Sequence, residues 1–210
     1  MRKQGLVWIL AAILATAVGA QELKPMILPA PQTDGGRPLM QALKERKSTR
    51  EFSAEKLPVQ VLANLLWAGF GVNRPDGRRT APSAMNWQEI GIYVVTADGT
   101  YVYDAAKNRL EPVTKEDLRS LAGTQSYAAT APVNLVYVAD MTKAGDTEGK
   151  EVLTGADTGF IAQNVYLYCA SEGLATVVRA SVDSDALGKA LKLKATQKIV
   201  LAQSVGYPKK

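Results

Sequence analysis

Glu45-Arg46-Lys47-Ser48-Thr49-Arg50-Glu51-Phe52 places three cations and two hydroxyls within five residues, directly after a helix-like segment. Basic side chains that lie close together repel one another unless an anion binds between them. Arginine matches two phosphate oxygens at a time, and serine and threonine hydroxyls fill the remaining lone pairs. This stretch therefore predicts a phosphate-binding site. For the segment on its own, a solvated basic helix end is the alternative.

Helix signals flank this stretch on both sides. Residues 21–37 are rich in proline and glycine, which predicts an extended arm and not a domain. Proline at the first helical position predicts one helix over residues 38–47 and a second over residues 58–71, the latter ended by glycine. Residues 71–89 form a long irregular loop, and a loop of this length in a compact domain is usually functional.

The remaining chain alternates strand and helix patterns. Asp98-Gly99 predicts a hairpin turn, and Thr114 followed by Asp117 resembles a capped helix start. The predicted elements are strands 90–96 and 101–103, helix 114–123, strand 132–139, helix 154–172, strand 174–178, helix 183–191 and strand 197–205. The long helix is expected to bury one face, made of Phe160, Ile161, Val165, Tyr168 and Cys169. The order predicts an α+β fold, a mixed sheet covered by helices, in one domain over residues 38–210.

The composition excludes several kinds of chemistry. The chain has 210 residues, no histidine and a single cysteine, Cys169. A Ser-His-Asp triad, a His-ligated metal and an internal disulfide are therefore excluded, and we expect no metal site. If the protein is an enzyme, an organic cofactor is expected to carry its chemistry. The net charge of +5 is too small to indicate binding to nucleic acid.

The N-terminus predicts a secretory signal peptide over residues 1–20. Arg2 and Lys3 form a positive region, Leu6 to Val18 is an apolar run too short to span a bilayer comfortably, and small residues precede Gln21. We therefore expect an exported, periplasmic protein with no membrane attachment after cleavage. A retained membrane anchor is the alternative.

Two further motifs carry recognition chemistry. Pro82-Ser83-Ala84-Met85-Asn86-Trp87-Gln88 combines a hydroxyl, two carboxamides and small residues. A carboxamide can read a ring edge that presents both a donor and an acceptor. Gly173-Leu174-Ala175-Thr176-Val177-Val178-Arg179-Ala180 is a small, β-branched strand that can lie against a flat ring. Taken separately, the first is also compatible with a polar turn and the second with a buried strand.

In this order and spacing, the three motifs resemble the nitroreductase family of FMN enzymes, most closely its branch of thiazole- and oxazole-forming dehydrogenases. The resemblance covers residues 39–207 and includes Asp157-Thr158-Gly159 and Val205-Gly206-Tyr207-Pro208. It implies a single-domain α+β fold with a mixed, mainly antiparallel sheet. It also implies a homodimer with one FMN in each of two clefts at the subunit interface, acting on a small organic molecule such as a nitroaromatic, a quinone or an azoline.

The resemblance also assigns roles to residues of the first two motifs. Arg46 and Ser48 match residues that hold the FMN phosphate, and Lys47 lies between them. Arg50 matches a cation near the pyrimidine edge of the flavin, where it would stabilise the reduced form, and Asn86 matches the amide that reads that edge.

The rest of the implied FMN site comes from the loop and the later strand. Val177 and Val178 match residues that lie against the ring face. Arg179 and Ala180 match positions whose backbone amides approach N5. The loop residues implied to approach the flavin are Pro82, Ser83 and Ala84.

The chain departs from the family pattern at a few positions. Glu89 stands where proline is usual, and Arg179 and Ala180 replace an acidic residue or glycine and a glycine. The chain ends soon after Tyr207, so we do not expect Lys209 or Lys210 to reach the phosphate. No dinucleotide-binding fingerprint is present, and NAD(P)H stays an open candidate for the electron donor. The alternatives are an exported flavin- or metabolite-binding protein without turnover and a structural module without a cofactor.

Overall fold

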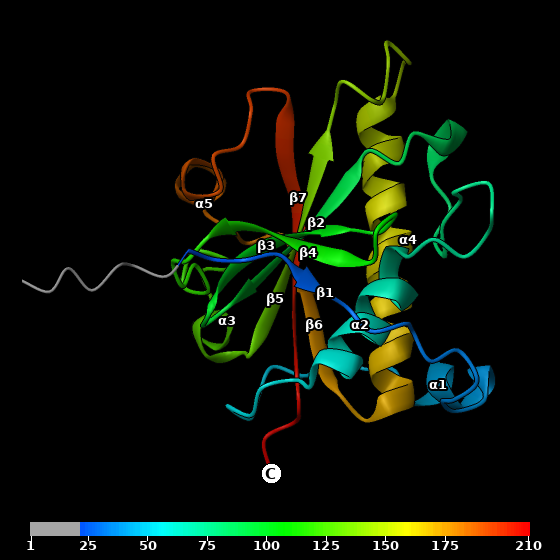
Figure 1. The fold of residues 1–210 in the computed structure, drawn as a ribbon, viewed down its shortest axis with the longest axis vertical. Coiled ribbons are helices and arrows are strands. Elements are labelled where there is room, and N and C mark those ends of the chain that lie inside the picture. The colour runs from blue at the N-terminus through cyan, green and yellow to red at the C-terminus, as the bar shows by residue number, and fades with distance from the viewer. Residues whose placement is uncertain (1–21) are drawn as a thin grey trace, which may run out of the picture.

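The computed structural model describes residues 22–210, so the predicted signal peptide lies outside the described residues. A seven-stranded sheet forms the middle of the molecule, with helices on both faces (Figure 1). Among residues 22–210, no helix has the length and apolar character needed to cross a membrane. The elements are β1 Met26–Ile27, α1 Leu39–Glu45, α2 Val59–Phe70, the 3₁₀ turn η1 Ala84–Asn86, β2 Ile90–Thr96, β3 Gly99–Asp104, β4 Arg109–Thr114, α3 Ser126–Thr130, β5 Val133–Asp140, α4 Lys150–Glu172, β6 Ala175–Arg179, α5 Ser184–Ala190 and β7 Gln197–Gly206.

The sheet has the strand order β1-β4-β3-β2-β5-β7-β6, and each of its pairings is antiparallel. The predicted hairpin is confirmed, with Thr96 opposite Gly99 in β2 and β3. The apolar strand β5 lies in the interior of the sheet, between β2 and β7. The α+β fold expected from the sequence is thus confirmed, but within the described residues the sheet is antiparallel throughout and not mixed.

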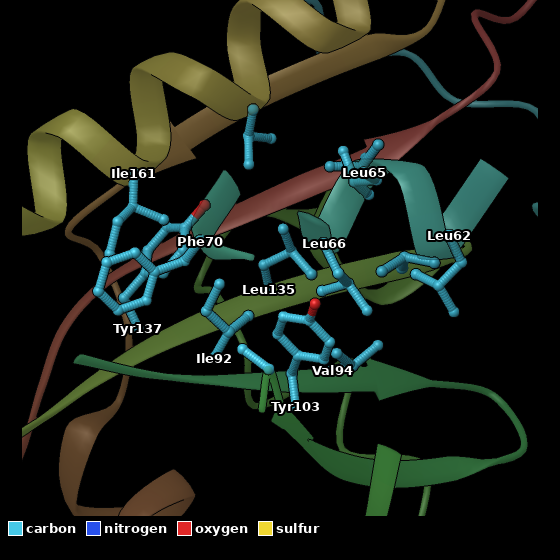
Figure 2. Packing of buried hydrophobic residues seen from close by; sticks show 14 of the residues in the cluster. Leu62, Leu65, Leu66, Phe70, Ile92, Val94, Tyr103, Leu135, Tyr137 and Ile161 are labelled. Atoms are coloured by element: carbon cyan, nitrogen blue, oxygen red, sulfur yellow. The ribbon is translucent and has the colours of Figure 1, made fainter. Parts of the chain in front are cut away.

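The interior strand β5 is buried on both faces, which explains its continuous apolar sequence. Leu135 and Tyr137 point toward α2 and α4, where they pack with Phe70 and Ile161 (Figure 2). Val136 and Val138 point to the opposite face, against the cluster that includes Leu187 of α5. Each large side chain buried in this way contributes about 1.5–3 kcal/mol to stability.

The helix α4 is the longest element and lies across one face of the sheet (Figure 1). Its 23 residues span about 35 Å. Gly173 ends it with a φ of 70°, which is the left-handed C-cap conformation predicted from the sequence. The helix begins at Lys150, four residues earlier than expected. On the other face, Asp183 caps α5 by accepting a hydrogen bond from the Ala186 amide, as predicted.

The helix predicted over residues 114–123 is wrong. Residues 109–114 form β4, and Asp117 does not cap a helix, because its carboxylate accepts hydrogen bonds from the backbone and side chain of Arg119. Local side-chain bonds of this kind compete with a helix. The extended arm of residues 21–37 also contributes β1, where Met26 pairs with Leu110 of β4.

The expected buried face of α4 is wrong at one position. Ile161, Val165 and Cys169 are fully buried, whereas the side chain of Phe160 is 47% exposed. Phe160 belongs to a different stripe of the helix, which carries Val152 and small residues and faces away from the sheet.

Candidate functional site

The basic stretch begins where α1 ends, and Tyr166 of α4 organises it. Arg46 is the C-cap of α1, and its guanidinium carbon lies 5.2 Å from the centre of the Tyr166 ring. At this distance the ring face attracts the cation. The Tyr166 hydroxyl lies 2.8 Å from Oγ of Ser48, within hydrogen-bonding distance. One buried aromatic residue therefore orients both predicted phosphate ligands.

The same hydroxyl connects this stretch to β6. The amide of Val178 donates a hydrogen bond to Oη of Tyr166 over 3.0 Å. A second connection runs through the backbone, where the amide of Thr49 donates to the carbonyl of Thr176 at 2.9 Å. The structure thus brings the first and third sequence motifs together, although more than 120 residues separate Ser48 from Val178 in the sequence.

A cavity of about 630 Å³ lies beside these contacts and is rich in cations. Arg37, Lys44, Lys47 and Lys209 line it. Arg37 is paired with Glu45, whereas the three lysines form no ion pair within residues 22–210. Such an arrangement leaves a net positive charge that suits an anionic ligand.

Lys209 lines this cavity, although the sequence led us to expect that the end of the chain would lie too far away. The C-terminal segment runs antiparallel to the basic stretch, with the amide of Ser53 donating to the carbonyl of Tyr207 at 2.9 Å. The amide of Lys209 donates in turn to the carbonyl of Glu51 at 3.2 Å. This pairing brings the end of the chain to the cavity.

The two valines of β6 point to opposite faces of the sheet, as neighbouring residues on a strand must. Val177 is buried in a small cluster with Phe52 and Ala131, on the side away from α4. Val178 is only partly buried and packs on the α4 side. Only Val178 therefore has a side chain available to a ligand beside Tyr166.

Arg179 follows Val178 and uses its side chain to hold the strand. Its guanidinium is buried and donates to Oδ1 of Asn134 at 2.7 Å and to Oγ of Ser204 at 2.8 Å. It also donates twice to the carbonyl of Ala122, at 2.6 and 3.1 Å. Burial lowers the pKa of this guanidinium from its ordinary value. Of the implied N5 pair, Arg179 thus presents only its backbone to a ligand, while the next residue, Ala180, is exposed.

Close approach of Arg179 depends on a glycine. A Cβ built on Gly123 would lie 2.2 Å from Nε of Arg179, which is far inside van der Waals contact. The short turn after β4 therefore accepts the guanidinium only because residue 123 has no side chain.

The second motif forms a separate and strained turn around η1. Met85, Asn86 and Gln88 have φ values of 47°, 57° and 48°, the left-handed region that residues other than glycine seldom adopt. Oγ of Ser83 accepts a hydrogen bond from the amide of Gln88 at 2.9 Å, which closes the turn. Clusters of strained residues are typical of ligand-binding sites.

Side-chain hydrogen bonds fix the orientation of the carboxamides in this turn. Oδ1 of Asn86 accepts from Nε2 of Gln88 at 3.0 Å, so the amide nitrogen of Asn86 is left to donate to a ligand. Oε1 of Gln88 accepts from Nε of Arg79 at 2.9 Å. The guanidinium of Arg79 also stacks on Phe70, with 4.4 Å to the ring centre. Sequence reasoning missed this role of Arg79.

The turn is anchored to α4, but far from Tyr166. The amide of Ala84 donates to Oδ2 of Asp157 at 2.8 Å. Asp157 precedes Tyr166 by nine residues, which is about 14 Å along the helix axis. A second cavity of about 470 Å³ lies at the turn, lined by Pro82, Ser83, Asn86 and arginines of the preceding loop. The described residues thus carry two separate candidate half-sites, one at Tyr166 and one at η1.

The residues present fit a flavin mononucleotide in their chemistry. The half-site at Tyr166 offers cations and a hydroxyl for the phosphate, and the half-site at η1 offers a free amide donor and small residues for a flat ring. Cys169 does not add redox chemistry, because it is completely buried and burial raises the pKa of its thiol well above the ordinary value. Among the described residues, His, Cys, Asp and Glu form no group of three that could hold a metal.

The residue that sequence reasoning missed is Tyr166. It lies one turn from both Ala162 and Cys169 in the sequence, which are buried core positions. Its pattern was therefore that of a core aromatic residue. The only signal was its hydroxyl, because a buried hydroxyl needs a hydrogen-bond partner.

Comparison with known proteins agrees with this geometry. A family model described as the nitroreductase family matches residues 43–207. A provisionally named nitroreductase of Ralstonia eutropha JMP134 has a crystal structure with a TM-score of 0.86 and 40% identity, over 92% of this chain and 93% of that chain. A provisionally named nitroreductase of Methanocaldococcus jannaschii is 29% identical over 168 residues, 74% of this chain and 85% of the relative.

A more distant likeness concerns the fold alone. The Escherichia coli microcin synthetase complex contains a chain with a TM-score of 0.68 and 20% identity, over 97% of this chain and 85% of that chain. Because the family model covers most of the described chain and the Ralstonia protein is 40% identical over nearly all of it, this chain belongs to the nitroreductase family.

Proposed function

We propose that this protein is an FMN-dependent oxidoreductase that binds one FMN in each of two clefts between the subunits of a homodimer. Membership of the nitroreductase family supports flavin-dependent oxidoreduction in general terms. The observation that carries the finer proposal is the Tyr166 hydroxyl, which joins Ser48 to the amide of Val178. A phosphate site and a ring-binding strand are thereby held together by one side chain.

In this proposal, Arg46, Lys47 and Ser48 hold the phosphate, and Lys209 completes the positive cavity. Arg50 is exposed and forms no ion pair within the described residues, so its charge is available to the pyrimidine edge of the flavin. When bound, FMN would supply hydride transfer at N5. The chain has no histidine, and it needs no side-chain acid or base for that step.

The half-site at η1 lies about 14 Å along α4 from Tyr166 of the same chain. In this proposal, a second copy supplies the η1 half-site that completes the cleft at Tyr166. The outer stripe of α4 carries Val152, Gly155, Ala156, Gly159 and Phe160, all exposed. No atom lies within 4 Å of the position of a Cβ on Gly155 or Gly159, so another helix could approach closely there. Exposed apolar side chains of α1, Leu39 and Met40, add to the uncovered surface.

The substrate is a small planar organic molecule: a nitroaromatic, a quinone or an azoline-like ring. The electron donor is NADH, NADPH or another reductant. We also propose that the mature protein is exported after removal of residues 1–20, because of the basic and apolar pattern of that segment. N-terminal sequencing of protein recovered from the producing cells tests this, and a mature chain that begins at Met1 contradicts it.

Purified protein tests the central proposal directly. We expect a flavin absorption spectrum, either as isolated or after addition of FMN and removal of the excess. Anaerobic mixing with NADH, NADPH and dithionite should then show which reductant bleaches that spectrum, and a nitroaromatic or quinone should restore it. Failure to bind FMN contradicts the proposal. Binding without any cycling would favour a flavin-binding protein without turnover.

A further inference from the structure

Glu89 is a buried carboxyl group directly after the strained turn. Its residue is only 1% exposed, although glutamate is almost never fully buried without a partner. Neither oxygen of its side chain accepts a hydrogen bond from a donor in the described residues. A carboxylate in this position would lose its hydration without compensation, so its ionised form is strongly disfavoured.

The neighbour of Glu89 is a second carboxyl group. Asp157 of α4 is 3% exposed and lies within hydrogen-bonding reach of the Glu89 side chain. Two carboxylates in contact and away from water cannot both be ionised, so the pair shares a proton. Asp157 already accepts a hydrogen bond from the amide of Ala84, whereas neither oxygen of the Glu89 side chain accepts one from a donor in the described residues. The proton therefore belongs on Glu89.

The other charged groups nearby do not change this assignment. Burial raises the pKa of Glu89, and the charge of Asp157 raises it further. A backbone hydrogen bond and the charge of Lys143 oppose these effects, but Lys143 donates its own hydrogen bond to the carbonyl of Gln88 at 3.2 Å. Asp140 is turned toward Thr142, and Arg79 is engaged by Gln88.

We propose that Glu89 is a positioning residue whose protonated carboxyl donates a hydrogen bond to Asp157 and thereby holds the turn of residues 82–88. The connection runs from Glu89 to Asp157, whose carboxylate accepts a hydrogen bond from the amide of Ala84. Ala84 is the first residue of η1, so Asp157 holds the start of the turn. The left-handed residues of the turn need such support, because strained conformations persist only where their surroundings over-determine them. The role of Glu89 in holding the turn does not depend on the proposed function. Only the effect of that turn on FMN binding rests on it.

The proposal predicts a specific dependence of stability on pH. The native state binds a proton at Glu89 that the unfolded state releases near pH 4.5. The contribution of Glu89 to stability is therefore fully present below that pH and is lost as pH rises through the raised pKa of the native state. The Glu89→Gln variant keeps a donor for Asp157 and has no proton to lose, so it should lack this fall.

Thermal unfolding without FMN measures the effect. Across this pH window, the wild-type melting temperature should decrease relative to that of Glu89→Gln. The matched control is Glu116→Gln, which changes an exposed glutamate in the same way and should follow the wild-type profile. Identical pH profiles for wild type and Glu89→Gln would overturn the proposal.

The turn itself provides a second readout. With Trp67 replaced by phenylalanine, the fluorescence of Trp87 reports on residues 82–88 in the mature chain. Its emission should change with pH as Glu89 titrates, and the change should be absent in Glu89→Gln. If that variant does not fold, Asp157→Asn replaces it, and removal of the neighbouring charge should shift the titration to lower pH. Emission that does not follow the titration overturns the positioning role. Neither readout involves FMN, so a failure here is distinct from a failure of the proposed function.

Discussion

The hydroxyl of Tyr166 lies 2.8 Å from Oγ of Ser48, at the point where the basic stretch meets the long helix. The same hydroxyl accepts the amide hydrogen of Val178. A side chain of α4 thus fixes the distance between the cations and β6. A ligand with a phosphate at one end and a flat ring near the other would meet a site whose geometry is set before it binds.

Replacing Tyr166 with phenylalanine should therefore weaken both the fold and the binding of FMN. The amide of Val178 and the hydroxyl of Ser48 lose a partner, which costs about 1–3 kcal/mol. Urea denaturation measures the stability, and a fluorescence titration measures the affinity for FMN. Tyr127→Phe is the matched control, because it keeps the ring that packs on Phe52. Equal affinities for Tyr166→Phe and wild type would show that the hydroxyl does not organise the site.

Loss of a cation from the basic stretch or the cavity should weaken the binding of FMN more than the binding of riboflavin, because riboflavin lacks the phosphate. Arg46→Ala should weaken FMN binding by about 1.5–3 kcal/mol, the range for a charged hydrogen bond, and leave riboflavin binding nearly unchanged. Lys209→Ala should have a smaller effect of the same kind. Lys189→Ala, on the distant helix α5, is the control. Equal losses for the two ligands would argue against a phosphate contact.

Arg50 should act on the reduced flavin and not on the phosphate. Arg50→Ala is expected to lower the midpoint potential, because reduced flavin carries negative charge near the pyrimidine edge. The shift is about 30 mV for each tenfold change in the affinity ratio of the reduced and oxidised forms. Titration against a reference dye measures it, with Arg46→Ala as the comparison. A change in affinity without a change in potential would place Arg50 elsewhere.

The outer stripe of α4 gives a test of the dimer. Gly159→Leu should leave the fold of one subunit intact, because nothing lies within 4 Å of the new Cβ. It should block a second helix, so sedimentation should show monomers and the affinity for FMN should fall. Gly188→Leu, on helix α5 at the other face of the sheet, would meet a neighbouring side chain only at an ordinary contact distance of 3.9 Å and should stay dimeric. A dimeric Gly159→Leu protein would place the subunit interface on another surface.

The buried guanidinium of Arg179 should be important for stability. Arg179→Met keeps the length of the side chain but removes the donor to Oγ of Ser204 and to the carbonyl of Ala122, while Asn134 keeps only the hydrogen bond from Ser204. We expect a loss of about 2–3 kcal/mol in the free energy of unfolding. Arg78→Met, at an exposed arginine paired only with Asp76, should cost less than about 0.5 kcal/mol. Similar effects of the two substitutions would contradict the structural role of Arg179.

The sequence predicted those helices and strands that are determined by residues within or next to the element itself. Asp183 precedes α5 because its carboxylate satisfies a free amide at the helix start, and β5 reads as one apolar run because both of its faces are buried. β4 was not predicted, because proline cannot donate a backbone hydrogen bond and Pro112 therefore argues against a strand. In the structure, Pro112 pairs with Tyr101 near an edge of the sheet, where proline is tolerated. For β1, two residues carry too little pattern to be noticed.

The candidate site shows the same limit. The basic stretch and the turn of residues 82–88 were visible because their residue types are unusual for a core. Tyr166 was not recognised as a site residue. A helical pattern does not distinguish a tyrosine that only packs in the core from one whose hydroxyl also forms hydrogen bonds. The predicted burial of Phe160 was wrong for a related reason. Phenylalanine is apolar, but the sequence pattern does not show which face of α4 the sheet covers.

The contact between Thr49 and Thr176 has a consequence for solubility. β6 is the last strand of the sheet, and its outer edge carries backbone groups that no other strand pairs. The amide of Thr49 donates a hydrogen bond to one of these groups, the carbonyl of Thr176. The bulky cationic side chains beside it hinder the approach of another chain. A substitution that loosens residues 46–50 should therefore promote edge-to-edge aggregation, so the segment that recognises an anion also acts as a guard against misassembly.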